Sequence, residues 1–259
     1  MMDQNQSKNI LSSVNNSIRI LRAFTMEQPQ KGVRELASEL GIGKSSVQRI
    51  LATLASQGFV RKNEETNKYE LGLSVLELSS IFLANIDLHH EALPIVTKLA
   101  HTHKETSHLA ILDKMDVVYL CKVESENSIK LRSHSGLHNH THCTSSGKLL
   151  LAYSDPYFVD SFLRNDLTKF TTTTITDRKA FLHELEKIRK QGYSVSRGEF
   201  RRDVTSVSAP IRDHSRKVIS AINLVGPSNR FTLPRIQFFA RELIRAGELI
   251  SEKLGYWSR

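Results

Sequence analysis

The chain has 259 residues, of which 39% are hydrophobic and 24% are charged. This balance is ordinary for a soluble globular protein and argues against a disordered chain, and the length favours two domains with sizeable cores. The formal net charge of +9 and the isoelectric point near 9.6 favour a polyanionic partner. Residues 1–72 hold ten Lys/Arg against seven Asp/Glu, a net of only +3, so the charge alone locates no binding site.

Cysteine content and hydropathy indicate the compartment. Cys121 and Cys143 are the only cysteines, too few for a disulfide framework and without the paired spacing of a zinc site. The chain contains no run of eighteen apolar residues, and its first eight residues are polar without a hydrophobic signal core. We therefore expect a cytoplasmic protein that is neither exported nor associated with a membrane.

After a polar tail of about twelve residues, the pattern predicts three short helices. The first carries Val14, Ile18 and Leu21 on one face, with Ile20 and Phe24 close by, and ends before Pro29. The second and third are joined by a tight turn at Gly41, because glycine accepts the left-handed conformation that ends a helix. Their apolar side chains recur at i, i+3, i+4 and i+7: Val33, Leu36, Ala37 and Leu40 in the second helix, and Val47, Ile50, Leu51 and Leu54 in the third.

Two short strand candidates, residues 59–62 and 68–71, follow the third helix and predict a basic hairpin, or wing. This order is typical of a winged helix-turn-helix, which places its second motif helix in the major groove and its wing cations near phosphates. The alternative is a small solvated helical hairpin that binds no DNA. The candidate DNA-binding residues are Arg34, Lys44, Ser45, Ser46, Gln48, Arg49, Thr53, Arg61, Lys62 and Lys68. Arg19 and Arg22 either reach phosphates or are solvated surface.

Residues 73–87 predict a linker helix that is apolar on more than one face. Such a helix needs a cover, which we expect to be a partner subunit, with the C-terminal domain of the same chain as the alternative. A dimer also suits a helix-turn-helix protein that reads two half-sites.

Residues 88–255 predict a mixed domain, so the fold class is α+β, with one antiparallel sheet flanked by helices. The domains are therefore 12–72, 73–87 and 88–255. Helices are expected at residues 88–104, 144–153, 155–164, 177–191 and 232–254, and strands at 106–112, 117–123, 129–133, 193–197, 204–211 and 218–225.

The start of the helix after Thr144 predicts an anion site. Thr144 is a typical N-cap, so the following backbone amides, with the hydroxyls of Ser145 and Ser146, suit a carboxylate. A phosphate loop is excluded because residue 142 is not glycine and Leu149 stands where Ser or Thr would bind Mg²⁺. Lys148 is therefore interpreted as structural or as a counter-charge near the pocket.

A histidine cluster precedes this helix. In an extended segment His138, His140 and His142 project to one side, together with His134 nearby, and could bind a divalent metal such as zinc. The simpler interpretation, which we prefer, is a polar loop with His142 hydrogen-bonded inside. We therefore predict no metal and no cofactor.

Several spaced motifs resemble the IclR (isocitrate lyase regulator) family of bacterial transcription factors, over roughly residues 12–255. They are residues 41–51 of the helix-turn-helix, 69–72 at the end of the wing, 141–148 at the anion site, 174–177, Gly192-Tyr193 with Glu199, 207–210, and Gly226-Pro227 with Arg230. The resemblance implies a winged helix-turn-helix, a linker helix and a GAF-like domain that binds a small effector, usually an organic acid, in homodimers or homotetramers.

The resemblance also implies the effector-binding positions. They fall on Ser145, Ser146, Ser196, Glu199, Ser206, Asn223 and Val225, and the N-cap Thr144 completes the candidate effector-binding set. The family's common acidic residues are replaced here by Ser196 and Arg197, its cysteine by Ser206, and its serine before Gly-Pro by Val225, so we expect a chemically distinct pocket. Arg197 either points inward, where it could pair with a second carboxylate, or lies on the surface.

We therefore expect a DNA-binding transcriptional regulator whose affinity for a double-stranded operator is modulated by a small carboxylate effector. Repression of a catabolic operon is the expected output, although the residues themselves also fit an activator. The alternative is a small-molecule-binding module or an enzyme without specific DNA binding. Catalysis is disfavoured because the Gly-x-Ser-x-Gly, His-Glu-x-x-His and dinucleotide-binding glycine motifs are absent.

Overall fold

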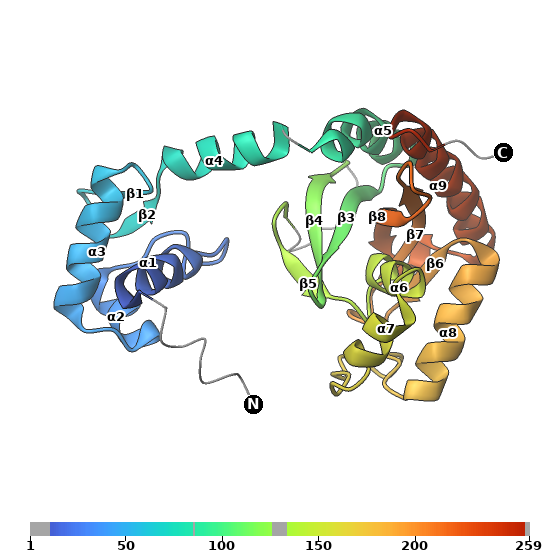
Figure 1. The fold of residues 1–259 in the computed structure, drawn as a ribbon, viewed down its shortest axis with the longest axis horizontal. Coiled ribbons are helices and arrows are strands. Elements are labelled where there is room, and N and C mark those ends of the chain that lie inside the picture. The colour runs from blue at the N-terminus through green and yellow to red at the C-terminus, as the bar shows by residue number, and fades with distance from the viewer. Residues whose placement is uncertain (1–10, 85, 126–133, 257–259) are drawn as a thin grey trace. The chain divides into compact units, whose positions relative to one another are not determined.

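The computed structural model describes residues 11–84, 86–125 and 134–256. Its contacts divide the chain into two compact units, Met1–Asn85 and Ile86–Arg259. Figure 1 shows helices and a short hairpin in the first unit, and a larger sheet with helices in the second. Each unit is described by itself.

The N-terminal unit is a winged helix-turn-helix. Its elements are α1 (Ser12–Arg22), α2 (Val33–Leu40), α3 (Lys44–Ser56), β1 (Val60–Lys62), β2 (Tyr69–Leu71) and α4 (Leu73–Ala84). The apolar faces predicted for the second and third helices are confirmed, since all eight side chains belong to the core of this unit, with Leu36, Val47 and Leu51 fully buried.

The predicted face of the first helix is confirmed only in part, since Leu21 packs against the core but the other two residues of that face do not. Val14 and Ile18 are exposed, whereas Ile20, Ala23 and Phe24 are buried in the core. These three buried residues also follow the i, i+3, i+4 spacing. The short first helix carries apolar residues on two faces, and periodicity does not decide which face meets α2 and α3.

The turn between α2 and α3 forms as predicted. Gly41 ends α2 in the left-handed conformation, with φ of 64°. The Nη2 of Arg19 donates to the carbonyl of Leu40 at 2.6 Å, so this arginine satisfies one of the acceptors left open at the end of α2. Arg19 therefore ties α1 to the turn that orients α3.

The wing is joined to the chain before α2. β1 and β2 pair antiparallel, and Lys31 pairs with Tyr69 through two backbone hydrogen bonds of 2.9 Å. This single β-bridge, just before α2, fixes the wing to the helical core.

The apolar linker helix α4 is exposed in the single chain. Leu73, Leu76, Leu78, Ile81 and Phe82 expose 55% to 81% of their surface. Within its own unit α4 leaves these apolar side chains uncovered, and the expected cover by a partner subunit stays a prediction. An exposed row of this kind is typical of an interaction surface.

The C-terminal unit contains one antiparallel sheet of six strands in the order β5-β4-β3-β8-β7-β6. The strands are β3 (Thr106–Asp113), β4 (Asp116–Val123), β5 (His138–His140), β6 (Ser194–Arg197), β7 (Val204–Arg212) and β8 (Val218–Pro227), and the helices are α5 (Asp87–His103), α6 (Ser145–Ala152), α7 (Pro156–Phe162), α8 (Arg178–Gln191) and α9 (Leu233–Lys253), with a short 3-10 turn at Ser228–Arg230. The predicted α+β class is confirmed.

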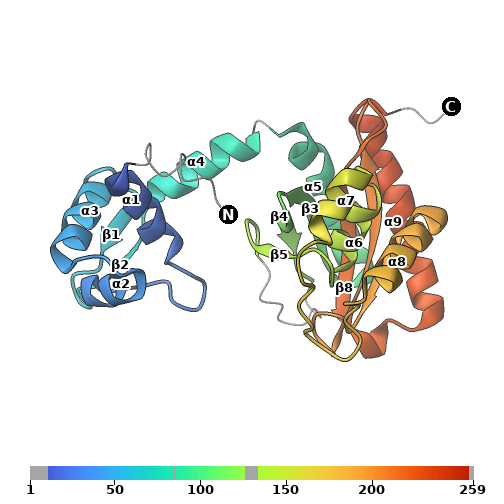
Figure 2. The ribbon, with the colours of Figure 1, turned by 60° about the horizontal axis from the view of Figure 1, so that its bottom comes forward.

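Helices cover both faces of this sheet (Figure 2). One core joins α5 and α9 to Val207, Ala209 and Ile211 of β7, and a second core joins α6, α7 and α8 to Ala221 of β8. Side chains alternate along a strand, so the residues between those of the first core point toward α6.

Five of the six predicted strands are found within two residues of their expected ends. The strand predicted at residues 129–133 lies outside the described residues. Strand β5 was not predicted, because His138, Asn139 and His140 lack the apolar alternation that marks a strand. Among the described residues, no helix is both long enough and apolar enough to span a bilayer.

Candidate DNA-binding surface and effector site

Helix α3 presents the polar surface that the sequence predicted. Val47 and Leu51 are fully buried, which leaves the opposite faces to solvent. The exposed side chains include Lys44, Ser45, Ser46, Gln48, Arg49 and Thr53. The hydroxyl of Thr53 donates to the carbonyl of Arg49 at 3.0 Å, so it is partly satisfied within the helix. The surface offers donors and acceptors of the kind that read base edges.

The candidate cations outside α3 stand in a different setting. Arg34 is exposed near the start of α2. Each of the three wing cations faces a carboxylate: Arg61 contacts Glu70, Lys62 lies 3.5 Å from Glu64, and Lys68 lies 3.2 Å from Glu35. Arg61 and Lys62 are exposed and Lys68 is half-buried.

The start of α6 in the C-terminal unit is built around its N-cap. The side chain of Thr144 accepts the N–H of Gly147 at 3.2 Å, which confirms the predicted cap. A Cβ on Gly147 would lie only 2.1 Å from the carbonyl oxygen of Thr141. Glycine at this position therefore lets the first turn of α6 approach the preceding loop.

A chain of hydrogen bonds connects this first turn to the sheet. The hydroxyls of Ser145 and Ser146 lie 2.6 and 3.1 Å from the hydroxyl of Ser208 on β7. The amide of Asn223 on β8 donates to Ser146 at 2.9 Å, and its oxygen lies 3.0 Å from Nδ1 of His108 on β3. All five side chains are buried, so the network holds α6 against three strands.

Strand register places three further predicted effector-binding residues, Ser196, Ser206 and Val225, on the sheet face that carries Ser208 and Asn223. Ser206 lies opposite Ser196 on one side and Val225 on the other. Val225 in turn lies opposite Thr106 of β3, so these four residues form a row beside the row of Ser208 and Asn223. Among the described residues, the buried hydroxyl of Thr106 has no hydrogen-bond partner, and such groups are uncommon unless a ligand or water meets them.

Glu199 is brought close to this region by an ion pair. Its carboxylate accepts from the buried ammonium of Lys148 at 2.6 Å, and Glu184 accepts from the same ammonium at 3.0 Å. Burial raises the pKa of Glu199 more than Lys148 lowers it. Lys148 is therefore a buried counter-charge, one of the two roles proposed from the sequence.

Two other predicted residues have defined surroundings. The hydroxyl of Ser196 donates to the carbonyl of Cys143 at 2.8 Å, which fixes β6 to the loop before α6. Burial raises the pKa of Cys143 to about 12, so this thiol stays protonated at neutral pH. Arg197 is exposed, and the inward orientation considered for it is wrong because it alternates with the inward Ser196.

The histidines before α6 do not converge. The Nε2 of His142 lies 2.8 Å from the carbonyl of Thr168, as the structural interpretation predicted, and desolvation lowers the pKa of this ring. His138 is exposed beside Asp116, and the ring of His140 packs 4.5 Å from that of Phe170. No group of three or more possible metal-binding side chains occurs among the described residues.

Two buried residues of the network were not predicted. Ser208 lies two positions after Ser206, and His108 lies two positions after Thr106, so strand alternation could have placed both on the polar face. The ring of His108 stacks on Tyr119 with 4.3 Å between centroids, and desolvation lowers its pKa to about 4. His108 is therefore neutral at pH 7.

The comparisons with known proteins address the whole chain. The family model for the C-terminal domain of the bacterial transcriptional regulator IclR matches residues 81–252, and the IclR helix-turn-helix model matches residues 13–64. The chain belongs to the IclR family. It is thus a transcriptional regulator with a DNA-binding helix-turn-helix domain and a C-terminal effector domain.

Individual relatives match this chain over nearly its full length. The HTH-type transcriptional regulator KdgR of Escherichia coli is 32% identical over 255 residues, which cover 98% of this chain and 97% of KdgR. The crystal structure of Thermotoga maritima IclR is 29% identical, with a TM-score of 0.80 over 94% of this chain and 99% of that one.

One further IclR homologue shares the fold. The homologue from Microbacterium hydrocarbonoxydans, solved in complex with 4-hydroxybenzoate, is 22% identical, with a TM-score of 0.84 over 94% of this chain and 99% of that chain.

Proposed function

We propose that this IclR-family protein is a non-enzymatic repressor of a catabolic operon. In this proposal α3 reads a double-stranded operator, and a small carboxylate effector binds at the start of α6. The observation that carries the effector assignment is the buried polar network of Ser145, Ser146, Ser208 and Asn223, which joins a helix N-terminus to the sheet.

The chemistry of this network favours an anion. A helix N-terminus presents backbone N–H groups and a positive dipole end, and the side chain of Thr144 accepts only the N–H of Gly147 among the amides of the first turn in the described hydrogen bonds. Asn223 donates to Ser146, and the hydroxyls of Ser145, Ser146 and Ser208 share two mutual hydrogen bonds, so one of their three protons is left to donate to a ligand. A carboxylate oxygen is the acceptor that such donors suit.

The relatives support the same ligand class. The homologue from Microbacterium hydrocarbonoxydans is described with bound 4-hydroxybenzoate, a carboxylate held by a protein of this fold. Ser196, Glu199, Ser206 and Val225 would then line the part of the pocket that distinguishes one acid from another. Ser206 is half-buried and Val225 is buried.

The proposed assembly is a homodimer or homotetramer that uses the apolar faces of α4. Leu76, Leu78 and Phe82 are more than half exposed, and burying such side chains contributes about 1.5 to 3 kcal/mol each. A dimer would hold two copies of α3 at the spacing of a pseudo-palindromic operator. An effector that binds one conformation of the C-terminal unit better than another would then change operator affinity.

Replacing Ser145 by Leu tests the effector site. Ser145→Leu should abolish the thermal stabilisation by the acid that stabilises the wild-type protein, because the larger apolar side chain removes a donor from the start of α6. Operator binding should persist. A panel of keto, hydroxy, sugar and aromatic acids is first screened by thermal shift to find the acid that stabilises the wild-type protein. Operator binding is then followed by mobility shift on the DNA upstream of the protein's own gene.

Ser161→Leu on the exposed surface of α7 is the matched control. It should keep both the acid response and operator binding. A Ser145→Leu protein that folds and still responds to the acid as the wild type does would refute the assignment of this site.

A further inference from the structure

Three carboxylates of the N-terminal unit, Glu35, Glu64 and Glu70, lie beside the wing cations. Arg61, Lys62 and Lys68 each face one. By contrast, no ion pair to Lys44 or Arg49 of α3 occurs among the described residues. The base-reading helix and the wing therefore differ in how much of their positive charge is available to DNA.

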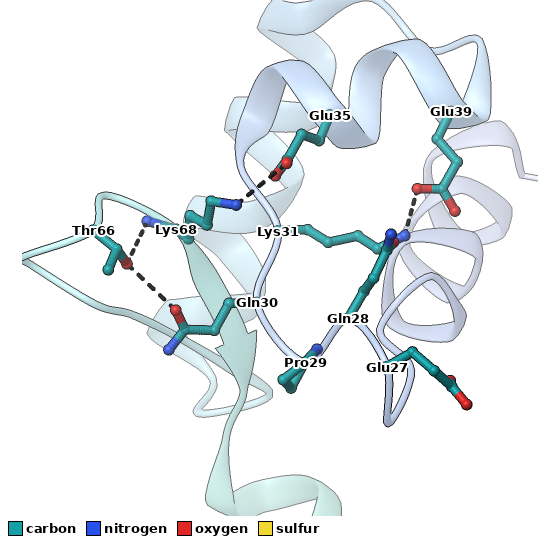
Figure 3. Close-up of a pocket in the computed structure, with 9 residues that line it drawn as sticks. All are labelled: Glu27, Gln28, Pro29, Gln30, Lys31, Glu35, Glu39, Thr66 and Lys68. Atoms are coloured by element: carbon teal, nitrogen blue, oxygen red, sulfur yellow. Dashed lines mark hydrogen bonds and ion pairs between the residues drawn. The ribbon is translucent and has the colours of Figure 1, made fainter. Parts of the chain in front are cut away.

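Glu35 is held in place independently of the lysine that it faces. One oxygen of its carboxylate accepts the N–H of Gly32, the N-cap residue of α2, at 2.6 Å. The other oxygen accepts from Lys68 at 3.2 Å (Figure 3). The pKa of Glu35 is lowered first by the Gly32 hydrogen bond and then by Lys68, so the carboxylate is ionised at neutral pH.

Glu70 is fixed in the same way on the wing itself. One oxygen accepts from the amide of Gln30 at 2.8 Å, and the other contacts Nε of Arg61. The pKa of Glu70 is lowered, first by the Gln30 hydrogen bond. Its side chain is only 20% exposed, whereas that of Arg61 is 74% exposed. Both carboxylates are therefore ordered by the fold before any DNA arrives.

We propose that Glu35 and Glu70 determine DNA specificity by competing with phosphates for Lys68 and Arg61. This inference rests on the proposed DNA-binding function of the wing. A phosphate that approaches either cation must displace a pre-positioned carboxylate. Lys68 and Arg61 then contribute little sequence-independent affinity to random DNA, while α3 keeps its cations for the operator.

The test measures the salt dependence of binding to a duplex of random sequence. Glu35→Gln and Glu70→Gln keep an acceptor for Gly32 and Gln30 but remove the charge. Each should tighten binding at low salt and steepen the plot of log K against log salt by about 0.9 for every cation released to a phosphate. The ratio of operator to random-DNA affinity should fall. Fluorescence anisotropy on the full-length protein supplies both quantities.

Glu27→Gln is the matched control. Glu27 is exposed and lines the same pocket as Glu35 and Lys68 (Figure 3), and no ion pair to it occurs among the described residues. It changes the net charge equally but should leave the salt slope unchanged. In a Lys68→Gln background, Glu35→Gln should lose its effect, because the cation through which it acts is absent. Thermal melting monitored by circular dichroism verifies that each variant is folded.

The outcomes separate this inference from the function on which it rests. If the wild-type protein binds its operator and both variants match Glu27→Gln in slope, the competition is refuted. If the effect of Glu35→Gln persists without Lys68, it is likewise refuted. A folded wild-type protein that binds no DNA at any salt concentration refutes the proposed function itself, and the inference with it.

Discussion

Arg49 and Lys62 carry the same charge but have different expected roles. Arg49 follows Gln48 on the exposed face of α3, whereas Leu51 faces the core. We predict that Arg49 reads a guanine edge. Arg49→Ala should then reduce discrimination against the wrong base by about 1 to 3 kcal/mol. Lys62→Ala should instead weaken all DNA alike. Competition binding with single-base operator variants makes this comparison, and an Arg49→Ala protein with unchanged base preference would contradict the assignment.

His108 gives the effector domain a defined pH dependence. Its pKa falls from 6.5 to about 4 on folding, mainly through desolvation. The unfolded chain therefore binds more protons between these values, so the contribution of His108 is fully present above pH 6.5 and is lost as the pH falls toward 4. The loss amounts to about 3 kcal/mol of unfolding free energy.

Urea unfolding at a series of pH values measures this contribution. A folded His108→Gln protein, which keeps a polar side chain beside Asn223, should show a smaller decrease than the wild type between pH 7 and pH 4.5, because the other groups with lowered pKa values remain. An identical decrease in both proteins would show that other groups cause it.

For single residues, the sequence predicted the role of a side chain better than it predicted the residue with which that side chain forms a hydrogen bond or ion pair. The cap at Thr144 could be predicted because Ser, Thr, Asp and Asn share one geometry at helix starts. The bond from Ser146 to Ser208 could not, because sixty-one residues separate them in the chain and only the sheet register brings them together. The carboxylate partners of the wing cations depend on tertiary structure in the same way.

At the scale of elements, periodicity identified α2, α3 and α9 because each has one apolar face against a core. It misplaced Val14 and Ile18 of α1, which has apolar residues on two faces, and it missed β5, whose three residues are polar. Register and layer order, which place Ser206 and Asn223 on the face toward α6, emerge only from the assembled sheet.

Helix α4 supports a prediction about assembly. Its exposed apolar side chains predict self-association, so Phe82→Glu should shift the protein from dimer or tetramer toward a monomer of 29.4 kDa. Introducing a charge into an apolar interface leaves that charge without compensation. Operator affinity should fall by about tenfold or more, or about 1.4 kcal/mol.

Sedimentation velocity makes this measurement. Tyr157→Glu serves as the control, because Tyr157 is 84% exposed on α7 and lies outside the proposed interface. A Phe82→Glu protein with the sedimentation coefficient of the wild type would exclude Phe82 from the interface.

In the whole molecule, the two units have separate proposed tasks. The N-terminal unit would present α3 to DNA, and the C-terminal unit holds the polar network beside α6. In the proposed mechanism the effector acts through its different affinity for two conformations, so the response can be no larger than that difference. DNA affinity and effector affinity must then change by the same factor when both are bound.

The central claim is tested most directly by a mobility shift of the full-length protein on its own upstream region, with and without each acid of the panel. We predict a salt-sensitive, sequence-selective shift that one carboxylic acid alters and that its uncharged amide does not. A specific shift that responds equally to an acid and its amide, or to none of the acids, would contradict carboxylate control of operator binding.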